Sequence, residues 1–236
     1  MQNSRLQDYR LKGMDHAIFA DFRTFLTERA YLNLSLRYQT DKLEYENSNK
    51  KELDFTKDFN GLYPTMNLAY TFNKKKGRML SLGYRYYQSF PNFGYFFDVK
   101  EVYSDNSYSI GNPNLDPEHF HLAELSYTHN KALNFVYSYR RGTDLVQVMT
   151  FTEEENPLVS YTKPENIGEN HLHRFSVEAR HSPFAWWFFK FTARANYEDR
   201  TYGDFHFNQW YGQASLNNNF TFKNGWGGTL GMSAST

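Results

Sequence analysis

Two histidine pairs have a type and spacing that suggest chemistry. His119 and His121, and likewise His171 and His173, are separated by one residue, so in a β-strand both imidazoles of a pair project from one face. Two such pairs are a conceivable metal-ligand set. However, each pair has the parity of its apolar neighbours, such as Leu125. That parity favours ordinary residues of an apolar strand face near its rim, and we expect no metal site.

Other potentially catalytic groups are isolated along the chain. The carboxylates of "PEHFH" and "YEDRTYGD" lie in polar stretches, and His206 near Asp204 has no serine nucleophile convincingly placed beside it. The sequence contains no GxSxG, HExxH or phosphate-binding glycine loop. We therefore expect that the protein is not an enzyme and has no resident cofactor.

A polar segment rich in aromatic residues runs from Ser89 to Glu118. Exposed aromatic rings beside Asn and Asp are typical of surfaces that capture ligands. The rings also suit a second arrangement, in which they fold over as a small core of their own. The candidate ligand-binding residues are Phe93, Tyr95, Phe96, Phe97, Tyr103 and Tyr108.

The elements that position these residues follow a two-residue period. In Tyr31–Gln39, "YLNLSLRYQ", apolar Leu32, Leu34 and Leu36 alternate with polar residues. The pattern recurs in ten segments with no helical stretch between them, which predicts an antiparallel meander. The segments are residues 16–26, 31–39, 62–72, 80–88, 122–128, 132–140, 174–180, 187–197 and 210–217, with a tenth beginning at Trp226.

The connections between these segments alternate in length. Short turns near Thr27, Asn73, His129, His181 and Lys223 alternate with longer stretches at residues 40–59, 89–118, 150–165 and 198–208. Short turns at one rim and long loops at the other are typical of outer-membrane barrels, where the loops are extracellular. Trp186, Trp187 and Trp226 lie near short turns and Trp210 lies far from its turn, which fits two interfacial aromatic girdles.

Composition is compatible with this interpretation. The 236 residues include 26 basic and 26 acidic side chains, so nothing indicates a nucleic-acid partner. The mean hydropathy of −0.76 does not argue against a membrane barrel, whose strands are only half apolar. We expect outer-membrane lipid against the apolar face, and a wide aqueous or plugged lumen against the other. The lumen-facing candidates are Arg37, Arg85, Glu124, Arg140, Arg174, Glu178 and Arg194.

One stretch carries a family resemblance. The run from Gly61 to Arg140 contains an arginine-bearing strand, a long loop, G-N-P-x-L-x-P-E from Gly111 to Glu118, and then "ELSY". It resembles the C-terminal barrel of TonB-dependent outer-membrane receptors, in the form abundant in Bacteroidetes. In physical terms, Pro113 and Pro117 remove backbone donors, so the motif ends a loop and lets a strand resume.

The resemblance implies a barrel of about 22 strands, an N-terminal plug domain, and energised import of a scarce nutrient in a Gram-negative outer membrane. The nutrient would be a chelated metal, a cofactor or an oligosaccharide, and a TonB-type energy-transducing complex would act through the plug. We expect residues 1–236 to be all-β and to form about ten strands of one antiparallel up-and-down transmembrane barrel, with the plug outside this chain. The alternative is a non-energised porin or surface-binding barrel.

Overall fold

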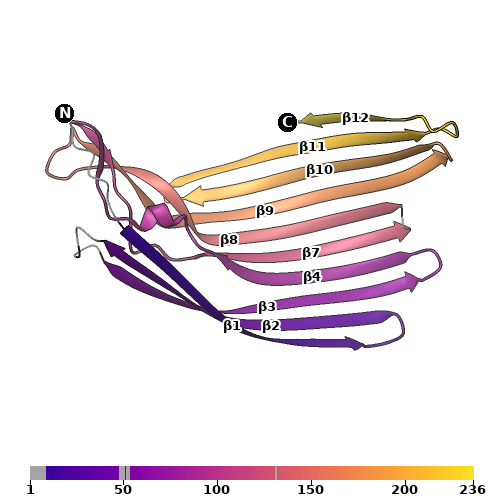
Figure 1. Cartoon of the computed structure of the whole chain (residues 1–236), viewed down its shortest axis with the longest axis horizontal. Coiled ribbons are helices and arrows are strands. Elements are labelled where there is room, and N and C mark those ends of the chain that lie inside the picture. Colours follow the sequence, from indigo (N-terminus) through magenta and orange to yellow (C-terminus); the bar gives the residue numbers. More distant parts are fainter. Residues whose placement is uncertain (1–8, 48–50, 52–53, 131) are drawn as a thin grey trace.

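The computed structural model describes residues 9–47, 51, 54–130 and 132–236, and most of these residues lie in β-strands (Figure 1). One short 3-10 helix, η2 (Phe93–Phe96), lies in the segment after β4. No helix in these ranges has the length and apolar character needed to cross a membrane. The strands are β1 (Tyr9–Phe25), β2 (Ala30–Asn47), β3 (Phe55–Asn73), β4 (Arg78–Ser89), β5 (Glu101–Ser104), β6 (Ser107–Ser109), β7 (Glu118–Asn130), β8 (Leu133–Thr152), β9 (Ser160–Phe184), β10 (Trp187–Tyr202), β11 (Phe205–Thr221) and β12 (Gly227–Ser235).

Ten of these strands form one antiparallel meander in chain order, as Figure 1 shows. The order is β1-β2-β3-β4-β7-β8-β9-β10-β11-β12, and all ten alternating segments of the sequence coincide with one of its strands. The described sheet is open, because β1 and β12 form its two edges and do not pair with each other. The predicted all-β meander, as part of a larger curved wall, is thereby confirmed.

The expected loops are mostly strands, which corrects the sequence-based boundaries. β2 continues to Asn47 and β3 begins at Phe55, while β8 continues to Thr152 and β9 begins at Ser160. β10 and β11 are joined only by residues 203–204, where Gly203 has a φ of +55° that suits glycine. Backbone pairing continues where the alternation of side chains fades, because ladder hydrogen bonds do not require an apolar face.

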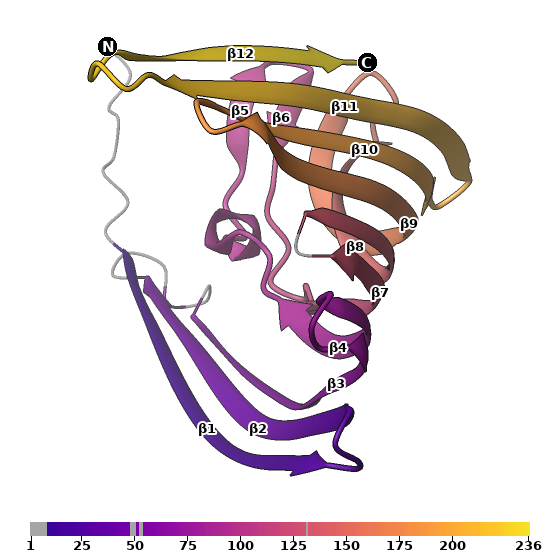
Figure 2. The same ribbon diagram turned by 90° about the vertical axis from the view of Figure 1, so that its right-hand side faces the viewer.

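The remaining long connection, between β4 and β7, folds back against the sheet. It contains η2 and the β5–β6 hairpin, and β6 pairs in parallel with β9 from Ser107↔Ser160 to Ser109↔Thr162. Figure 2 shows this connection on the concave side of the curved sheet. The longest segment outside the meander therefore occupies the space that the wall surrounds.

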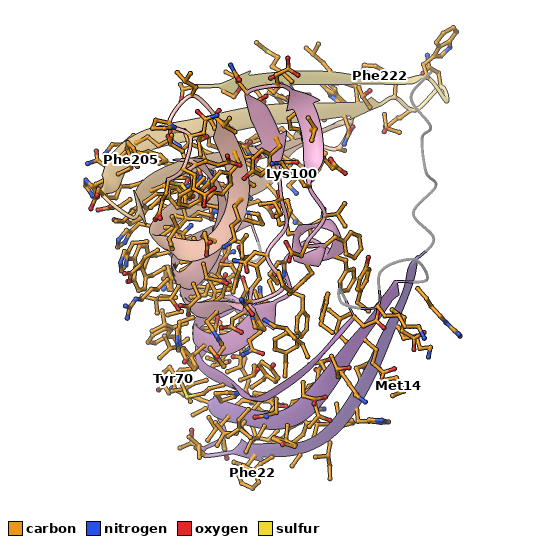
Figure 3. All side chains as sticks on the ribbon, turned by 90° about the vertical axis from the view of Figure 1, so that its left-hand side faces the viewer. Met14, Phe22, Tyr70, Lys100, Phe205 and Phe222 are labelled. Carbon is orange, nitrogen blue, oxygen red and sulfur yellow. The ribbon has the colours of Figure 1, made fainter. Side chains whose placement is uncertain are left out.

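Residues of directly paired positions share a face of the sheet, so the register defines two faces. Figure 3 shows Phe22 and Tyr70 projecting from the convex side, whereas Lys100, in the connection between β4 and β7, lies on the concave side. From Phe22, pairing runs continuously across nine strands to Trp210. This convex row is Phe22, Leu34, Met66, Tyr84, Ala123, Tyr139, His173, Tyr197 and Trp210.

The convex row also gives the tilt of the strands. Phe22 lies three residues before the end of β1 at Phe25, whereas Trp210 lies eleven residues before the end of β11 at Thr221. Relative to the rim of short turns, the row thus climbs eight residues over eight steps between neighbouring strands. At about 3.3 Å per residue and about 4.8 Å per step, the tilt is about 35°, at the lower end of the range for membrane barrels.

A proline divides the wall near its loop side. The β3–β4 ladder ends at Thr65↔Arg85, although β3 extends back to Phe55 and still pairs with β2. The residue beside this last pair is Pro64, which has no N–H to donate to a ladder. On the side of Pro64 that is farther from the short turns, β1, β2 and the first half of β3 therefore separate from β4.

The apolar core bridges that separation. Leu43 of β2, and Phe96 and Leu115 of the β4–β7 connection, are buried together, with Phe55 and Val146 packed against them. Leu115 has no exposed surface and Phe96 is 1% exposed. The connection thus joins the β1–β3 part of the wall to β8 through apolar burial.

Candidate functional site

The G-N-P-x-L-x-P-E motif anchors the β4–β7 connection to the wall. A Cβ on Gly111 would lie 2.1 Å from the carbonyl oxygen of Phe97, so only glycine fits there. The buried Asn112 side-chain amide donates to the Pro164 carbonyl oxygen (3.0 Å) and to Glu165 Oε2 (3.1 Å). These contacts join segments more than 50 residues apart in the chain.

The second half of the motif, residues 115–118, is also held by hydrogen bonds to the wall. The Asn166 side chain accepts from the Asp116 backbone N–H (2.8 Å) and donates to its carbonyl oxygen (2.9 Å). The Glu118 carboxylate accepts from the Val146 backbone N–H at 2.9 Å. Lys57 Nζ donates to the Leu115 carbonyl oxygen and lies 3.6 Å from Asp116 Oδ1. Burial lowers the pKa of the Lys57 ammonium, and the Asp116 carboxylate opposes that shift.

The β5–β6 hairpin is fixed by a stack of charged and aromatic groups. Lys100 Nζ lies 3.5 Å from the ring centroid of Tyr108, which stacks on Tyr161 with centroids 5.2 Å apart. Lys100 also lies 3.5 Å from the Glu153 carboxylate. The hydrogen bond to Glu153 raises the pKa of the Tyr108 phenol to about 12. This hairpin is therefore a positioned element and not a loose loop tip.

A cavity of about 540 Å³ lies between this folded connection and the inner faces of β8 and β9. Its volume falls in the range of small-molecule sites, roughly 300–1,000 Å³. Tyr95 and Tyr103 contribute half-exposed and exposed rings, and Val148 of β8 and Thr162 of β9 form the opposite wall. Glu101 contributes a carboxylate. The cavity combines aromatic, hydroxyl and acidic groups on the concave side of the sheet.

The six aromatic candidates separate into different environments. Tyr95, Phe97 and Tyr103 line the cavity, and Phe97 also packs on Tyr45 at 4.9 Å between ring centroids. Phe96 is buried in the core, so it supports the connection and cannot touch a ligand directly. Phe93 lines a separate space of about 240 Å³ against β1–β3, and Tyr108 belongs to the stack with Lys100. Both arrangements anticipated from the sequence, an exposed aromatic surface and a small core, are thus present.

The seven charged candidates all lie on the concave face by register. A single row of paired residues runs Thr65, Arg85, Leu122, Arg140, Leu172, Glu198 and Gln209. Glu124 and Arg174 both pair with Ser138 and therefore share its face of the sheet. Arg194 pairs with Ser176, and Arg37 pairs with Tyr63.

These side chains do not converge on one point. The Arg85 guanidinium lies over the Tyr87 ring and that of Arg140 lies over Phe120, at 5.0 and 5.4 Å. Arg174 Nε donates to Asn196 Oδ1 at 2.9 Å. Glu178 forms ion pairs with Arg180 (2.5 Å) and Lys190 (2.8 Å). The charges are spread along the wall as separate contacts, so they do not define a single ligand site.

Sequence reasoning missed Glu198, the most buried carboxylate among the residues that the structure describes. Glu198 is 2% exposed and pairs with Arg200 at 2.7 Å, and Asn170 donates to it at 3.2 Å. Residues 198–208 were expected to form a loop, which obscured the concave position of Glu198. Glu198 lies four residues after Arg194, and an even spacing in a strand predicts that both side chains lie on the same face.

Both histidine pairs lie on the convex face, in two similar modules. Tyr84 and Tyr86 hydroxyls contact Nδ1 of His121 (2.8 Å) and His119 (2.5 Å). In the second module, the hydroxyls of Tyr137 and Tyr139 contact Nδ1 of His173 (2.9 Å) and His171 (2.7 Å). Within the described part of the chain, no three His, Asp or Glu residues are grouped to hold a metal ion. His206 contacts Asp199 at 2.7 Å and not the neighbouring Asp204.

The convex face also carries a shallow apolar groove of about 590 Å³ across β4 and β7–β11. Large side chains such as Phe135 and Phe175 border it, while Ala193, Ala195 and Ala214 form its floor. It lies between the tyrosine–histidine modules and an aromatic cluster at the short turns. That cluster comprises Phe184, Trp186, Trp187, Phe220 and Phe222.

Comparison with known proteins identifies the family. Residues 3–236 match the outer membrane protein beta-barrel family, so the chain belongs to that family and is an outer-membrane protein. Comparison with curated proteins finds no matching sequence. The match confirms the predicted fold and localisation.

Solved structures share the fold at low sequence identity. The copper transporter OprC matches with a TM-score of 0.61 and 13% identity, over 95% of this chain and 39% of that one. The FrpB iron transporter from Neisseria meningitidis matches with a TM-score of 0.62 and 14% identity, over 93% and 32%. The siderophore receptor PirA from Pseudomonas aeruginosa matches with a TM-score of 0.52 and 9% identity, over 96% and 57%. The chain thus spans one third to somewhat over half of the length of these structures.

Proposed function

We propose that this chain forms part of the wall and of the ligand-binding mouth of an outer-membrane receptor that imports a small nutrient. The observation that carries this proposal is the cavity of about 540 Å³ between the anchored β4–β7 connection and the inner faces of β8 and β9. A ligand held there lies inside the curve of the wall, at the rim opposite the short turns. That rim is extracellular in outer-membrane barrels.

The two faces support transport through the interior. On the convex face, Leu34, Phe135 and Phe175 lie in the band between the aromatic groups of the two rims, where lipid chains cover apolar side chains. Acyl chains also fill the shallow groove over Ala193 and Ala195. On the concave face, Arg85, Arg140 and Glu124 require water or polar partners, which a lumen or a plug supplies.

Energised import is the favoured mode because the named relatives of this fold are transporters and a siderophore receptor. In this mode, a plug domain outside this chain couples the barrel to a TonB-type complex. A non-energised porin or surface-binding barrel remains the competing function, and it shares the wall and the cavity. The two functions differ in whether uptake depends on the proton gradient.

The test uses the full-length receptor in its own outer membrane. A strain lacking the receptor is screened for the carbon or metal source on which it no longer grows, and uptake of that source is then measured. Tyr95→Ala and Tyr103→Ala should each reduce uptake at least fivefold, whereas Phe205→Ala, an exposed aromatic outside the cavity, should not.

A proton uncoupler separates the two functions. Loss of uptake with the uncoupler indicates the energised receptor, whereas uptake that persists indicates a porin. If the cavity variants take up the source at the unmodified rate, the cavity is not the binding site.

A further inference from the structure

The charge of the candidate cavity restricts what it can bind. Among the residues that the structure describes, its lining includes one carboxylate, Glu101, and no Lys or Arg side chain. The lysines that lie near it are already paired, Lys100 with Glu153 at 3.5 Å and Lys163 with Glu165 at 2.7 Å. An anionic ligand entering the cavity would therefore find no unpaired cation among these residues.

The surface around the cavity is acidic as well. Asp98 and Asp105 are exposed on the β4–β7 connection, and Glu154 and Glu155 are exposed on the neighbouring β8–β9 connection. Repulsion from several like charges lowers the local concentration of an anion and slows its association. A multiply charged anionic metal chelate is thus opposed both at the approach and within the cavity.

The aromatic groups are arranged as fixed platforms. The Tyr103 hydroxyl hydrogen-bonds to Ser109 Oγ at 2.9 Å across the β5–β6 hairpin. Tyr95 lies in η2, whose first turn is capped by the Asn92 side chain accepting from the Gly94 backbone N–H at 2.9 Å. Rings held in place lose little conformational entropy when a ligand packs on them. They offer flat apolar faces without requiring a charge on the ligand.

Hydroxyl and carboxylate groups complete the lining. Ser109 and Thr162 offer hydroxyls, and Glu101 and Asn92 offer acceptors. Fixed aromatic faces beside neutral donors and acceptors match a ligand that has C–H faces and many hydroxyls. We propose that the nutrient is an uncharged oligosaccharide and not an anionic metal chelate, an inference that rests on the proposed function.

The test measures binding to the purified full-length receptor in detergent. The neutral probes are an array of plant, fungal and animal oligosaccharides, and the anionic probes are oligogalacturonate and ferric enterobactin. We expect at least one neutral oligosaccharide to bind, with affinity that changes less than twofold between 50 and 500 mM salt because no charge pairing is involved. Tyr95→Ala and Tyr103→Ala should each weaken it at least tenfold, and Phe205→Ala should not.

Glu101→Gln separates a neutral ligand from a cationic one. An oligosaccharide loses one charge-assisted hydrogen bond, so its affinity should fall by less than about tenfold. Cu²⁺ is assayed in parallel as the cationic probe. Binding of Cu²⁺ that Glu101→Gln abolishes, in a receptor that binds no neutral oligosaccharide, would overturn the proposed ligand class.

The remaining outcomes distinguish the inference from the function on which it rests. Binding of ferric enterobactin or oligogalacturonate that is lost in the tyrosine variants would overturn the oligosaccharide inference and leave the proposed binding site standing. Binding of any probe that no cavity variant alters would overturn the proposed site itself. Failure of every neutral oligosaccharide on the array would overturn the inference of an uncharged sugar ligand.

Discussion

Leu115→Ala should release the β4–β7 connection from the wall without disturbing the strands. Leu115 has no exposed surface and packs with Leu43 and Phe96 at the point where the connection joins β2 to β8. Truncating a fully buried leucine removes about 2–5 kcal/mol, from lost transfer energy and the cavity left behind. Taking about 3 kcal/mol, the population of the undocked connection should increase roughly 150-fold.

Limited proteolysis of the full-length receptor in intact cells measures that population, with cleavage between Lys100 and Ser109 as the readout. The matched control is Leu158→Ala, the same change at a side chain that is 79% exposed on the neighbouring connection. Cleavage should accelerate strongly in Leu115→Ala and by less than twofold in Leu158→Ala. Equal rates in the two variants would refute the reasoning that apolar burial at Leu115 holds the connection in place.

Three further predictions concern the faces, the rims and the hairpin. Leu34→Arg should destabilise folding into lipid by about 2–4 kcal/mol, because it places a charge on the convex face, whereas Arg37→Leu on the concave face should cost much less. Heat-modifiable electrophoretic mobility measures folding of both variants, and equal effects would contradict the assignment of the two faces. A cysteine at Asn106, in the β5–β6 turn, should react with a membrane-impermeant thiol reagent on intact cells, whereas a cysteine at Lys75, in the β3–β4 turn, should not; the opposite labelling would invert the topology. The pKa of Tyr108 is raised from 10.0 to about 12, so docking of the β5–β6 hairpin should be strongest below pH 10 and weaken as the pH rises from 10 through 12. Proteolysis of the hairpin should accelerate over this pH range, and in Tyr108→Phe it should not.

The wall was accessible from sequence because its signal is local. In residues 31–39 every second side chain is apolar, and that period describes a strand with two different faces whatever lies beside it. The ten strands, the short turns and the charged face that includes Arg85 and Arg140 followed from this pattern. The positions of the strand ends could not be predicted in this way. Near Glu198, for example, polar residues occupy both faces of the strand, so the alternation disappears although backbone pairing continues.

The candidate cavity was accessible only in part. The aromatic segment and its G-N-P-x-L-x-P-E motif indicated where a ligand-binding element would lie. Nothing local to Phe96 and Tyr103 distinguishes a buried support from an exposed platform, since both are aromatic residues in a polar stretch. Phe96 is buried because Leu43 of β2 packs with it, whereas Tyr103 belongs to a hairpin that is held by the stacking of Tyr108 on Tyr161 of β9.

The amino-acid pattern by itself determined that this protein is an antiparallel β-sheet with two different faces, because alternation with a period of two residues can be recognised within one strand, whatever its neighbours are. Tertiary structure alone decided that the long connection lies on the concave side and forms one wall of a cavity. That outcome depends on contacts such as Asn112 with Pro164 and Lys57 with Leu115, which join residues 52 and 58 positions apart. Pairings at such separations are set by the closure of the fold and by the burial it permits, and a sequence pattern does not encode them one segment at a time.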